Sequence, residues 1–466
     1  MAEDLWSAMR RAAEEAIAYR QRIDFAERTP VASPAQMFAA FDQPVPEQGG
    51  APDAIIADLI ERATPGLRAM TNARFFGWVI GNSHPIGVAA DFLTSAWGQN
   101  NGNAFATPAA AAVEAEVARW VLDLLGLPAQ CSVGLVTGAT VANFVGLAAG
   151  RSEVLRRAGW DVEGDGLFGA PPVNVLIGAD AHATVYSALR YLGLGTKRVI
   201  EVETDERGQI KASAFERALK QASGPTLAVL QAGQLNTGGF DPFAEIVPLA
   251  RAHGAWTHVD GAFGLWAQAA PQRRHLSAGV EQCDSWATDG HKWLQTPYDC
   301  GFAIIRDAEA HRRAMAISAS YLPPADDDQR DPSSFVPELS RRARAFPAWA
   351  VIRFLGRDGI AELVERNCRQ AAMLADLLDG SDGISAPIRP ELNQLMLRFG
   401  DDDQATLATI DALQRDARLF AGPAMWRGQW AMRISVCSHA TSDEDITITA
   451  AAIREVWQSV RNAGGQ

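Results

Sequence analysis

The run Asp289-Gly290-His291-Lys292-Trp293 carries the residues best suited to chemistry. It follows a short apolar run that is typical of a buried strand. We therefore expect Lys292 to lie inside a folded domain, where a lysine rarely stands without a partner. A desolvated lysine has a lowered pKa and can be a neutral amine near pH 7, the form that Schiff-base chemistry needs. A single lysine after a strand is more often a surface residue, so this interpretation needs support from other residues.

The elements that would position this lysine alternate between apolar runs and helical segments from residue 173 onward. Such alternation predicts an α/β domain with a mostly parallel sheet. Ligands in these folds bind beyond the carboxyl ends of the strands, so polar residues at strand ends become site candidates. The strands are predicted at 173–177, 198–202, 226–230, 256–259 and 285–288.

Polar residues follow three further predicted strands. His182 follows the first strand of the series, and Asp260 closes the fourth, with Ala262 just beyond it. Asn236 and Thr237 lie in the segment after the third strand. Taken one at a time, His182 is more often structural and Asp260 more often a capping or ion-paired residue. Their shared place at one edge of the sheet makes a common site the better interpretation.

A separate small-residue turn comes earlier, where a short strand leads through Gly138, Ala139 and Thr140 into a helix. Small residues let backbone N–H groups approach an anion, and the first turn of a helix favours negative charge. The pattern is neither a dinucleotide-binding glycine motif nor a Walker loop. The turn is therefore a candidate phosphate site, and it is a weak signal when taken alone.

These candidates together match the needs of one cofactor. Pyridoxal phosphate needs a lysine, a carboxylate near the pyridine nitrogen and a site for its phosphate. Lys292, Asp260 and the turn at 138–140 would supply them, and His182 could stack on the ring opposite the small side chain of Ala262. We predict pyridoxal 5′-phosphate as the cofactor, and we predict no metal site.

The same residues resemble a known family, the group II pyridoxal-dependent decarboxylases, which includes aromatic amino acid, histidine and glutamate decarboxylases. The resemblance rests on the runs 258–262, 289–294 and 297–301, on their spacing, and on 75–77, 231–238 and 433–437. It covers the chain from roughly residue 70 to the end. It implies an amino acid decarboxylase with the fold of type I pyridoxal-phosphate-dependent transferases, working as a homodimer with its sites at the interface.

The resemblance also implies roles for individual residues. Lys292 would hold the cofactor, His182 would stack on it, and Asp260 would pair with the ring nitrogen above Ala262. The phosphate would be received by the backbone and side chains of Gly138, Ala139 and Thr140, helped by Asp289 or His291. Asn236 or Thr237 would lie near Asp260 or the substrate carboxylate, and Trp78 would line the substrate pocket.

The expected organisation has three parts. Residues 1–71 form an N-terminal helical segment at the dimer interface, with helices at 5–28 and 53–68 flanking a Pro/Gly-rich connection. Residues 72–340 form the large domain that binds the cofactor. Residues 341–466 form a small α+β domain, with helices predicted at 345–379, 403–418 and 442–462 and strands at 395–399 and 430–436.

One departure from the family concerns a loop expected at 322–337. Family decarboxylases present a tyrosine there, which protonates the carbanion left after CO₂ is lost. This loop has no tyrosine; Phe335 is its only aromatic residue, and Tyr321 lies at its edge. In family members with phenylalanine at that position the product shifts to an aldehyde. The alternatives are therefore an aldehyde synthase or another pyridoxal-phosphate carbon–carbon lyase or aminotransferase, and, from a different class, a non-catalytic binding protein.

Composition limits the remaining choices. A net charge of −13 over 466 residues argues against nucleic acid, which needs a basic face. No apolar run is long enough to span a membrane, and the acidic N-terminus does not resemble a signal peptide. The five cysteines are scattered without a Cys-x-x-Cys motif, as expected for a reduced cytoplasmic protein. The aromatic residues Phe76, Trp78, Trp97 and Phe105 favour an aromatic or apolar amino acid as the substrate.

Overall fold

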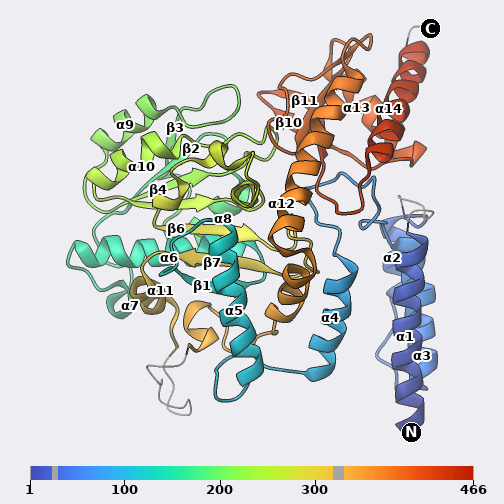
Figure 1. Cartoon of the computed structure of the whole chain (residues 1–466), viewed down its shortest axis with the longest axis horizontal. Helices are drawn as coiled ribbons and strands as arrows, with labels where there is room; N and C mark the ends of the chain where they lie inside the picture. Colours follow the sequence, from blue (N-terminus) through green and yellow to red (C-terminus); the bar gives the residue numbers. More distant parts are fainter. Residues whose placement is uncertain (1, 24–29, 318–329, 465–466) are drawn as a thin grey trace.

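The computed structural model describes residues 2–23, 30–317 and 330–464. Figure 1 shows three parts: a large domain around a twisted sheet, a smaller C-terminal domain, and N-terminal helices that stand beside them. Among the described residues, no helix combines the length and the apolar character that crossing a membrane requires.

The large domain is built on a seven-stranded sheet in the order β1-β7-β6-β5-β4-β2-β3. The strands β2 to β6 pair in parallel, whereas β7 is antiparallel to both of its neighbours. All five strands predicted from residue 173 onward are confirmed, and β7 is an addition that the alternation pattern did not predict. The strands are β1 Ser132–Val136, β2 Asn174–Gly178, β3 Ile200–Val202, β4 Thr226–Gln231, β5 Trp256–Asp260, β6 Ser285–Asp289 and β7 Gly301–Ile305.

Helices cover both faces of this sheet, so the strands are apolar on both sides. Two separate cores result, one including Phe215, Phe243 and Trp286, and the other including Val145, Leu189 and other side chains of α6 and α8. The helices of the large domain are α5 Pro108–Leu124, α6 Ala139–Arg157, α7 Val162–Asp165, α8 Ala183–Tyr191, α9 Ala212–Gln221, α10 Phe243–Ala252 and α11 Ala308–Met315.

The small domain is an antiparallel sheet in the order β10-β11-β9-β8 with helices packed on it. A long helix, α12 Ala345–Leu378, runs between the two domains and is broken at Gly356, where φ is 63°. Phe76 lies in the core of the small domain, and its carbonyl accepts the N–H of Ser435. The other elements are β8 Ile384–Ser385, β9 Gln394–Phe399, α13 Asp403–Asp416, β10 Gly422–Trp426, β11 Gln429–Ser435 and α14 Asp443–Gly464.

The N-terminal part contains α1 Ala2–Arg22, α2 Pro34–Phe41 and α3 Pro52–Ala63, and α4 Pro85–Trp97 follows it. The prediction missed α2, which lies in the supposed Pro/Gly-rich connection, and also α4. Local capping explains both helices, because each begins with a proline in its first turn, after Ser33 in α2 and His84 in α4. Figure 1 shows α1 and α3 side by side, next to α4.

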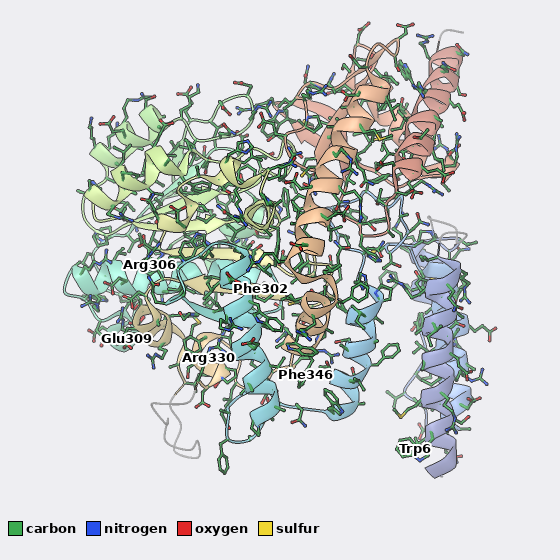
Figure 2. All side chains as sticks on the ribbon, viewed as in Figure 1. Trp6, Phe302, Arg306, Glu309, Arg330 and Phe346 are labelled. Carbon is green, nitrogen blue, oxygen red and sulfur yellow. The ribbon has the colours of Figure 1, made fainter. Side chains whose placement is uncertain are left out.

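The segment expected as an irregular loop at 322–337 contains one short regular element in its described part. Residues 322–329 lie outside the described residues, as does Tyr321. Pro332–Phe335 forms a 3-10 helix, η5, and Phe335 is buried with its ring against His311 at a centroid distance of 5.2 Å. Arg330 lies over the Phe335 ring, and Figure 2 shows it beside this segment. Phe335 is therefore a packing residue in this chain, and the aldehyde synthase stays the alternative prediction.

Candidate active site

Lys292 and Asp289 form the centre of the site. The Lys292 Nζ lies 3.2 Å from Oδ2 of Asp289, which closes β6 and is 2% exposed. The other carboxylate oxygen, Oδ1, accepts the backbone N–H of Ala139 at 2.6 Å. The Trp266 indole N–H donates to the Asp289 carbonyl at 2.9 Å and fixes the end of the strand. One carboxylate thus connects the lysine to the first turn of α6.

The turn at 138–140 is built for close approach. A Cβ on Gly138 would lie 3.0 Å from Cε1 of His291, and a Cβ on Gly301 would lie 2.5 Å from the Gly138 Cα. His291 accepts the N–H of Cys300 at Nδ1, so its Nε2 carries a proton and faces Asp289 at 3.6 Å. A carboxylate already rests on the Ala139 amide, which indicates that this turn accommodates an anion.

Asp260 ends β5, His182 caps α8 shortly after β2, and the two line one small cavity. Asp260 is 5% exposed, and its Oδ1 accepts the N–H of Ala262 at 3.3 Å. Burial lowers the pKa of His182, while the charge of Asp260 raises it and the charge of Lys292 lowers it. A lowered pKa keeps the His182 ring neutral near pH 7, as stacking on an aromatic ring would require.

The alternatives Asn236 and Thr237 have different surroundings. Thr237 donates its hydroxyl to the carbonyl of Arg207, which lies in the connection between β3 and α9. Asn236 faces the small domain, and its Oδ1 accepts an N–H of Arg433 at 3.4 Å. Burial lowers the pKa of Arg433 to about 10, and no carboxylate of the described residues forms an ion pair with it. The prediction gave Arg433 no role, although a lone arginine in an apolar strand pattern was a signal for one.

The segment after Gly77 forms a wall against the lysine. The Gly81 N–H donates to the His291 carbonyl at 3.1 Å, and a Cβ on Gly81 would lie 2.2 Å from the Lys292 carbonyl oxygen. Trp78 is half-exposed and packs against Phe420 at 5.1 Å. Phe76 does not line this wall, because it is 1% exposed within the small-domain core, and this corrects the prediction.

The two other predicted aromatic residues point to the surface of the chain. Phe105 is exposed, and Trp97 is half-exposed with its ring edge-on to Phe346 at 5.1 Å. Among the described residues, neither makes a hydrogen bond or a ring contact with Lys292, Asp260 or His182. Phe105 and Trp97 could line a substrate pocket only if another protein chain covered them.

The residues present fit pyridoxal phosphate. Lys292 is accessible in a site that is otherwise closed, Asp260 offers a carboxylate at the end of the neighbouring strand, and the 138–140 turn accepts an anion. The four predicted groups Lys292, Asp260, His182 and the turn meet at one edge of the sheet, as the strand order requires.

Comparisons with known proteins agree with this geometry. Residues 34–393 match the pyridoxal-dependent decarboxylase conserved domain. The chain is 26% identical to the aromatic-L-amino-acid decarboxylase of Drosophila lebanonensis, with 83% of this chain and 96% of that protein covered. It is 29% identical to the L-2,4-diaminobutyrate decarboxylase of Rhizobium meliloti (strain 1021), with 81% and 75% covered.

Its fold is also that of solved structures. The structure of Oryza sativa TDC with PLP and tryptamine superposes with a TM-score of 0.91 at 21% identity, and 98% of each chain is covered. The family match covers most of the chain and includes every predicted site residue. The chain therefore belongs to the family of pyridoxal-dependent decarboxylases, enzymes that use pyridoxal phosphate to remove CO₂ from amino acids.

Proposed function

We propose that this decarboxylase acts on an L-amino acid with an aromatic or apolar side chain and releases the corresponding amine. The observation that carries the substrate class is the wall beside the lysine, where Trp78 packs on Phe420 and Gly81 contacts the Lys292 backbone. An apolar wall favours an apolar side chain. An amine is the product of simple decarboxylation, and an aldehyde from oxidative decarboxylation is the alternative product.

The roles of the residues follow from their charges and burial. Lys292 would hold the cofactor, and Asp260 would keep a negative charge at the pyridine nitrogen, while the turn at 138–140 and His291 would hold the phosphate. Bound pyridoxal phosphate supplies the electron sink for the loss of CO₂. His182, kept neutral by burial, would lie on the ring face.

Arg433 would bind the carboxylate of the substrate. It is a largely buried cation that pairs with an amide and not with an acid among the described residues, and a desolvated cation is strongly favoured by an anionic partner. We expect Arg433→Lys to raise KM about tenfold or more, because the bidentate geometry is lost. Steady-state kinetics test this expectation. The control is Arg398→Lys, because Arg398 lies in the same small-domain sheet as Arg433 but already forms an ion pair with Asp403. An unchanged KM would remove Arg433 from the substrate site.

The first experiment is product analysis by mass spectrometry. The purified, cofactor-loaded protein is incubated with each common amino acid, and Lys292→Ala is the blank. We expect an amine from an aromatic or apolar amino acid. An aldehyde with ammonia would move the enzyme to the oxidative reaction. An amine only from a charged amino acid would overturn the substrate class and leave the decarboxylation intact.

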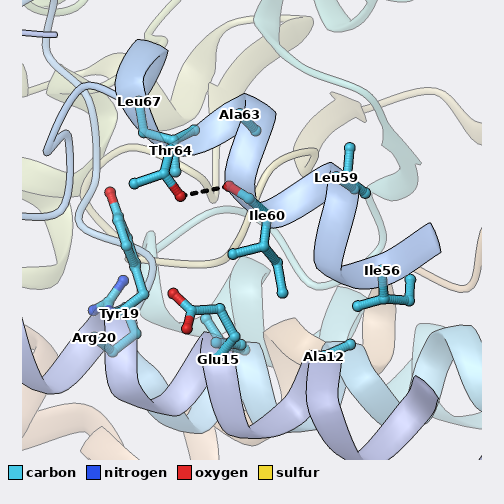
Figure 3. Close-up of a pocket in the computed structure, with 12 residues that line it drawn as sticks. Ala12, Glu15, Tyr19, Arg20, Ile56, Leu59, Ile60, Ala63, Thr64 and Leu67 are labelled. Atoms are coloured by element: carbon cyan, nitrogen blue, oxygen red, sulfur yellow. Dashed lines mark hydrogen bonds between the residues drawn. The ribbon is translucent and has the colours of Figure 1, made fainter. Parts of the chain in front are cut away.

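A homodimer is part of the proposal, with residues 1–71 covering a second copy of the chain. Figure 3 shows a pocket between α1 and α3 with mostly apolar side chains, including Ala12, Ile56, Ile60 and Leu67. Several large apolar residues of these helices are exposed, and Trp6 extends from α1 in Figure 2. Light scattering at twice the chain mass would support the dimer, and the chain mass itself would contradict it.

The proposed location is the cytoplasm. All five cysteines are free and buried, which is usual for proteins of reducing compartments. Fractionation of cells that express the tagged protein tests the location, and recovery outside the cytoplasm would contradict it.

A further inference from the structure

Gln295 lies three residues after Lys292 and is fully buried. Its backbone has a positive φ of 64°, which turns the chain back immediately after the lysine. Its side-chain Nε2 donates to the carbonyl oxygens of Lys292 at 3.0 Å and Trp293 at 3.2 Å. The same nitrogen donates to the carbonyl of Cys437 in the small domain at 2.6 Å.

The carbonyl oxygen of the same side chain binds two more segments. Gln295 Oε1 accepts the N–H of Asn82 at 3.0 Å and the N–H of His439 at 3.1 Å. The backbone carbonyl of Gln295 accepts the N–H of His84 at 2.8 Å. Backbone groups have fixed donor and acceptor roles, so these partners also determine which end of the amide is nitrogen.

One side chain therefore joins three segments that meet at the lysine. These are the lysine turn itself, the wall that begins at Trp78, and the segment just after β11, the strand that carries Arg433 four residues before Cys437. Gly81 already brings the wall into contact with the Lys292 carbonyl. One amide thus contacts the lysine turn, the wall and the segment after the arginine together.

We propose that Gln295 is a positioning residue that sets the orientation of Lys292 relative to Arg433 and the Trp78 wall. It does not touch substrate or cofactor, and it acts through the Lys292 backbone. The proposal rests on the proposed roles of Lys292 and Arg433. A displacement of about 1 Å at a reacting group lowers the rate about 100-fold. Because loss of the Gln295 amide would let Lys292 shift, we expect the loss to lower kcat more than it changes KM.

A purely structural role is the competing explanation, and Gln370 provides the matched control. Gln370 is also fully buried, and its Nε2 donates to the Thr441 carbonyl at 2.9 Å and to Asp443 at 3.1 Å. It makes no hydrogen bond to the lysine turn. Gln370→Met and Gln295→Met should therefore lose similar stability, while only the second should disturb the lysine.

The experiment compares holoenzyme of wild type, Gln295→Met, Gln295→Glu and Gln370→Met. The readouts are kcat, KM, thermal unfolding and the circular dichroism of the bound cofactor, which reports the orientation of its ring. We expect Gln295→Met to lower kcat about 100-fold and to change the dichroism, with KM much less affected. Gln295→Glu keeps the acceptor for Asn82 and His439 but places an oxygen against three carbonyls, so it should show the same effects.

Gln295→Glu also replaces Gln295→Met if the latter does not fold. Normal kcat and normal dichroism in a destabilised Gln295 variant would overturn the proposal and leave Gln295 a structural residue. The same changes in Gln370→Met would also overturn it, because the effect would then follow from any buried glutamine. A wild-type protein that forms no product would contradict the proposed function instead, so the two failures are distinguishable.

Discussion

At the scale of single residues, Asp289 makes the contacts that bear most directly on cofactor binding. Its carboxylate contacts both the Lys292 amine and the Ala139 amide, two groups that the cofactor also requires. We expected Asp289 to help bind the phosphate. A carboxylate beside a phosphate dianion is repelled by it, and the repulsion is strong where little water is present. We therefore propose that Asp289 competes with the phosphate for the turn.

We expect Asp289→Asn to bind pyridoxal phosphate about tenfold more tightly than the wild type, because one negative charge is removed from the phosphate site. Absorbance titration of the cofactor-free protein measures this at low and moderate salt. Asp284→Asn is the control, since Asp284 accepts the Thr257 N–H at the opposite end of the same pair of strands. Weaker binding in the variant would show that the carboxylate holds the cofactor.

At the scale of elements, a buried ion pair joins η5 and the chain after it to the large domain. Glu114 of α5 and Arg341 are both fully buried and lie 2.8 Å apart, and Asn101 donates to the same carboxylate at 2.7 Å. Arg330 contributes a second cation at 3.7 Å. These contacts attach the described part of the predicted loop to α5 and to the edge strand β1.

We expect Glu114→Gln to lower the free energy of unfolding by about 3 to 5 kcal/mol, because it leaves buried arginines without a counter-charge. Urea unfolding followed by fluorescence measures this. Glu116→Gln on the same helix is the control; Glu116 pairs with Arg119 at the surface, and its loss should leave the midpoint nearly unchanged. Equal midpoints for the two variants would contradict the role of the ion pair.

At the scale of the whole molecule, buried histidines make stability depend on pH. Burial lowers the pKa of His258, His311 and His439 to about 3 in the folded protein. The unfolded chain takes up these protons below its ordinary pKa of about 6.5, and the folded chain does not. Each histidine therefore lowers the free energy of unfolding as the pH falls from about 6.5 to about 3. Asp241, whose pKa is raised to about 7 by burial, acts in the opposite direction and offsets one of them.

We expect the free energy of unfolding to fall as the pH is lowered from about 6.5 to about 4, by roughly 1.4 kcal/mol per pH unit for each uncompensated histidine. Urea titrations across this range measure the slope. His311→Asn should reduce the slope, because it removes one of the three groups. Stability that is constant or rises toward pH 4 would contradict these shifts.

The sequence by itself determined the α/β class, the strands from residue 173 onward and the candidates His182, Asp260 and Lys292. These follow from local signals, since apolar runs mark buried strands and the carboxyl ends of parallel strands meet at one edge. The start of α6 was equally local, because a turn of small residues opens the helix.

Only the tertiary structure decided which long-range partners these residues have. Phe76 was expected at the substrate pocket, yet it is buried in the core of the small domain, since an apolar pattern does not say which surface it will cover. Asp289 gained the Ala139 amide and Gln295 gained the Cys437 carbonyl from segments more than a hundred positions away. Hydrogen bonds over such separations leave no periodic trace in the sequence, because only the packing of strands within the large domain and of the two domains against each other brings these partners together.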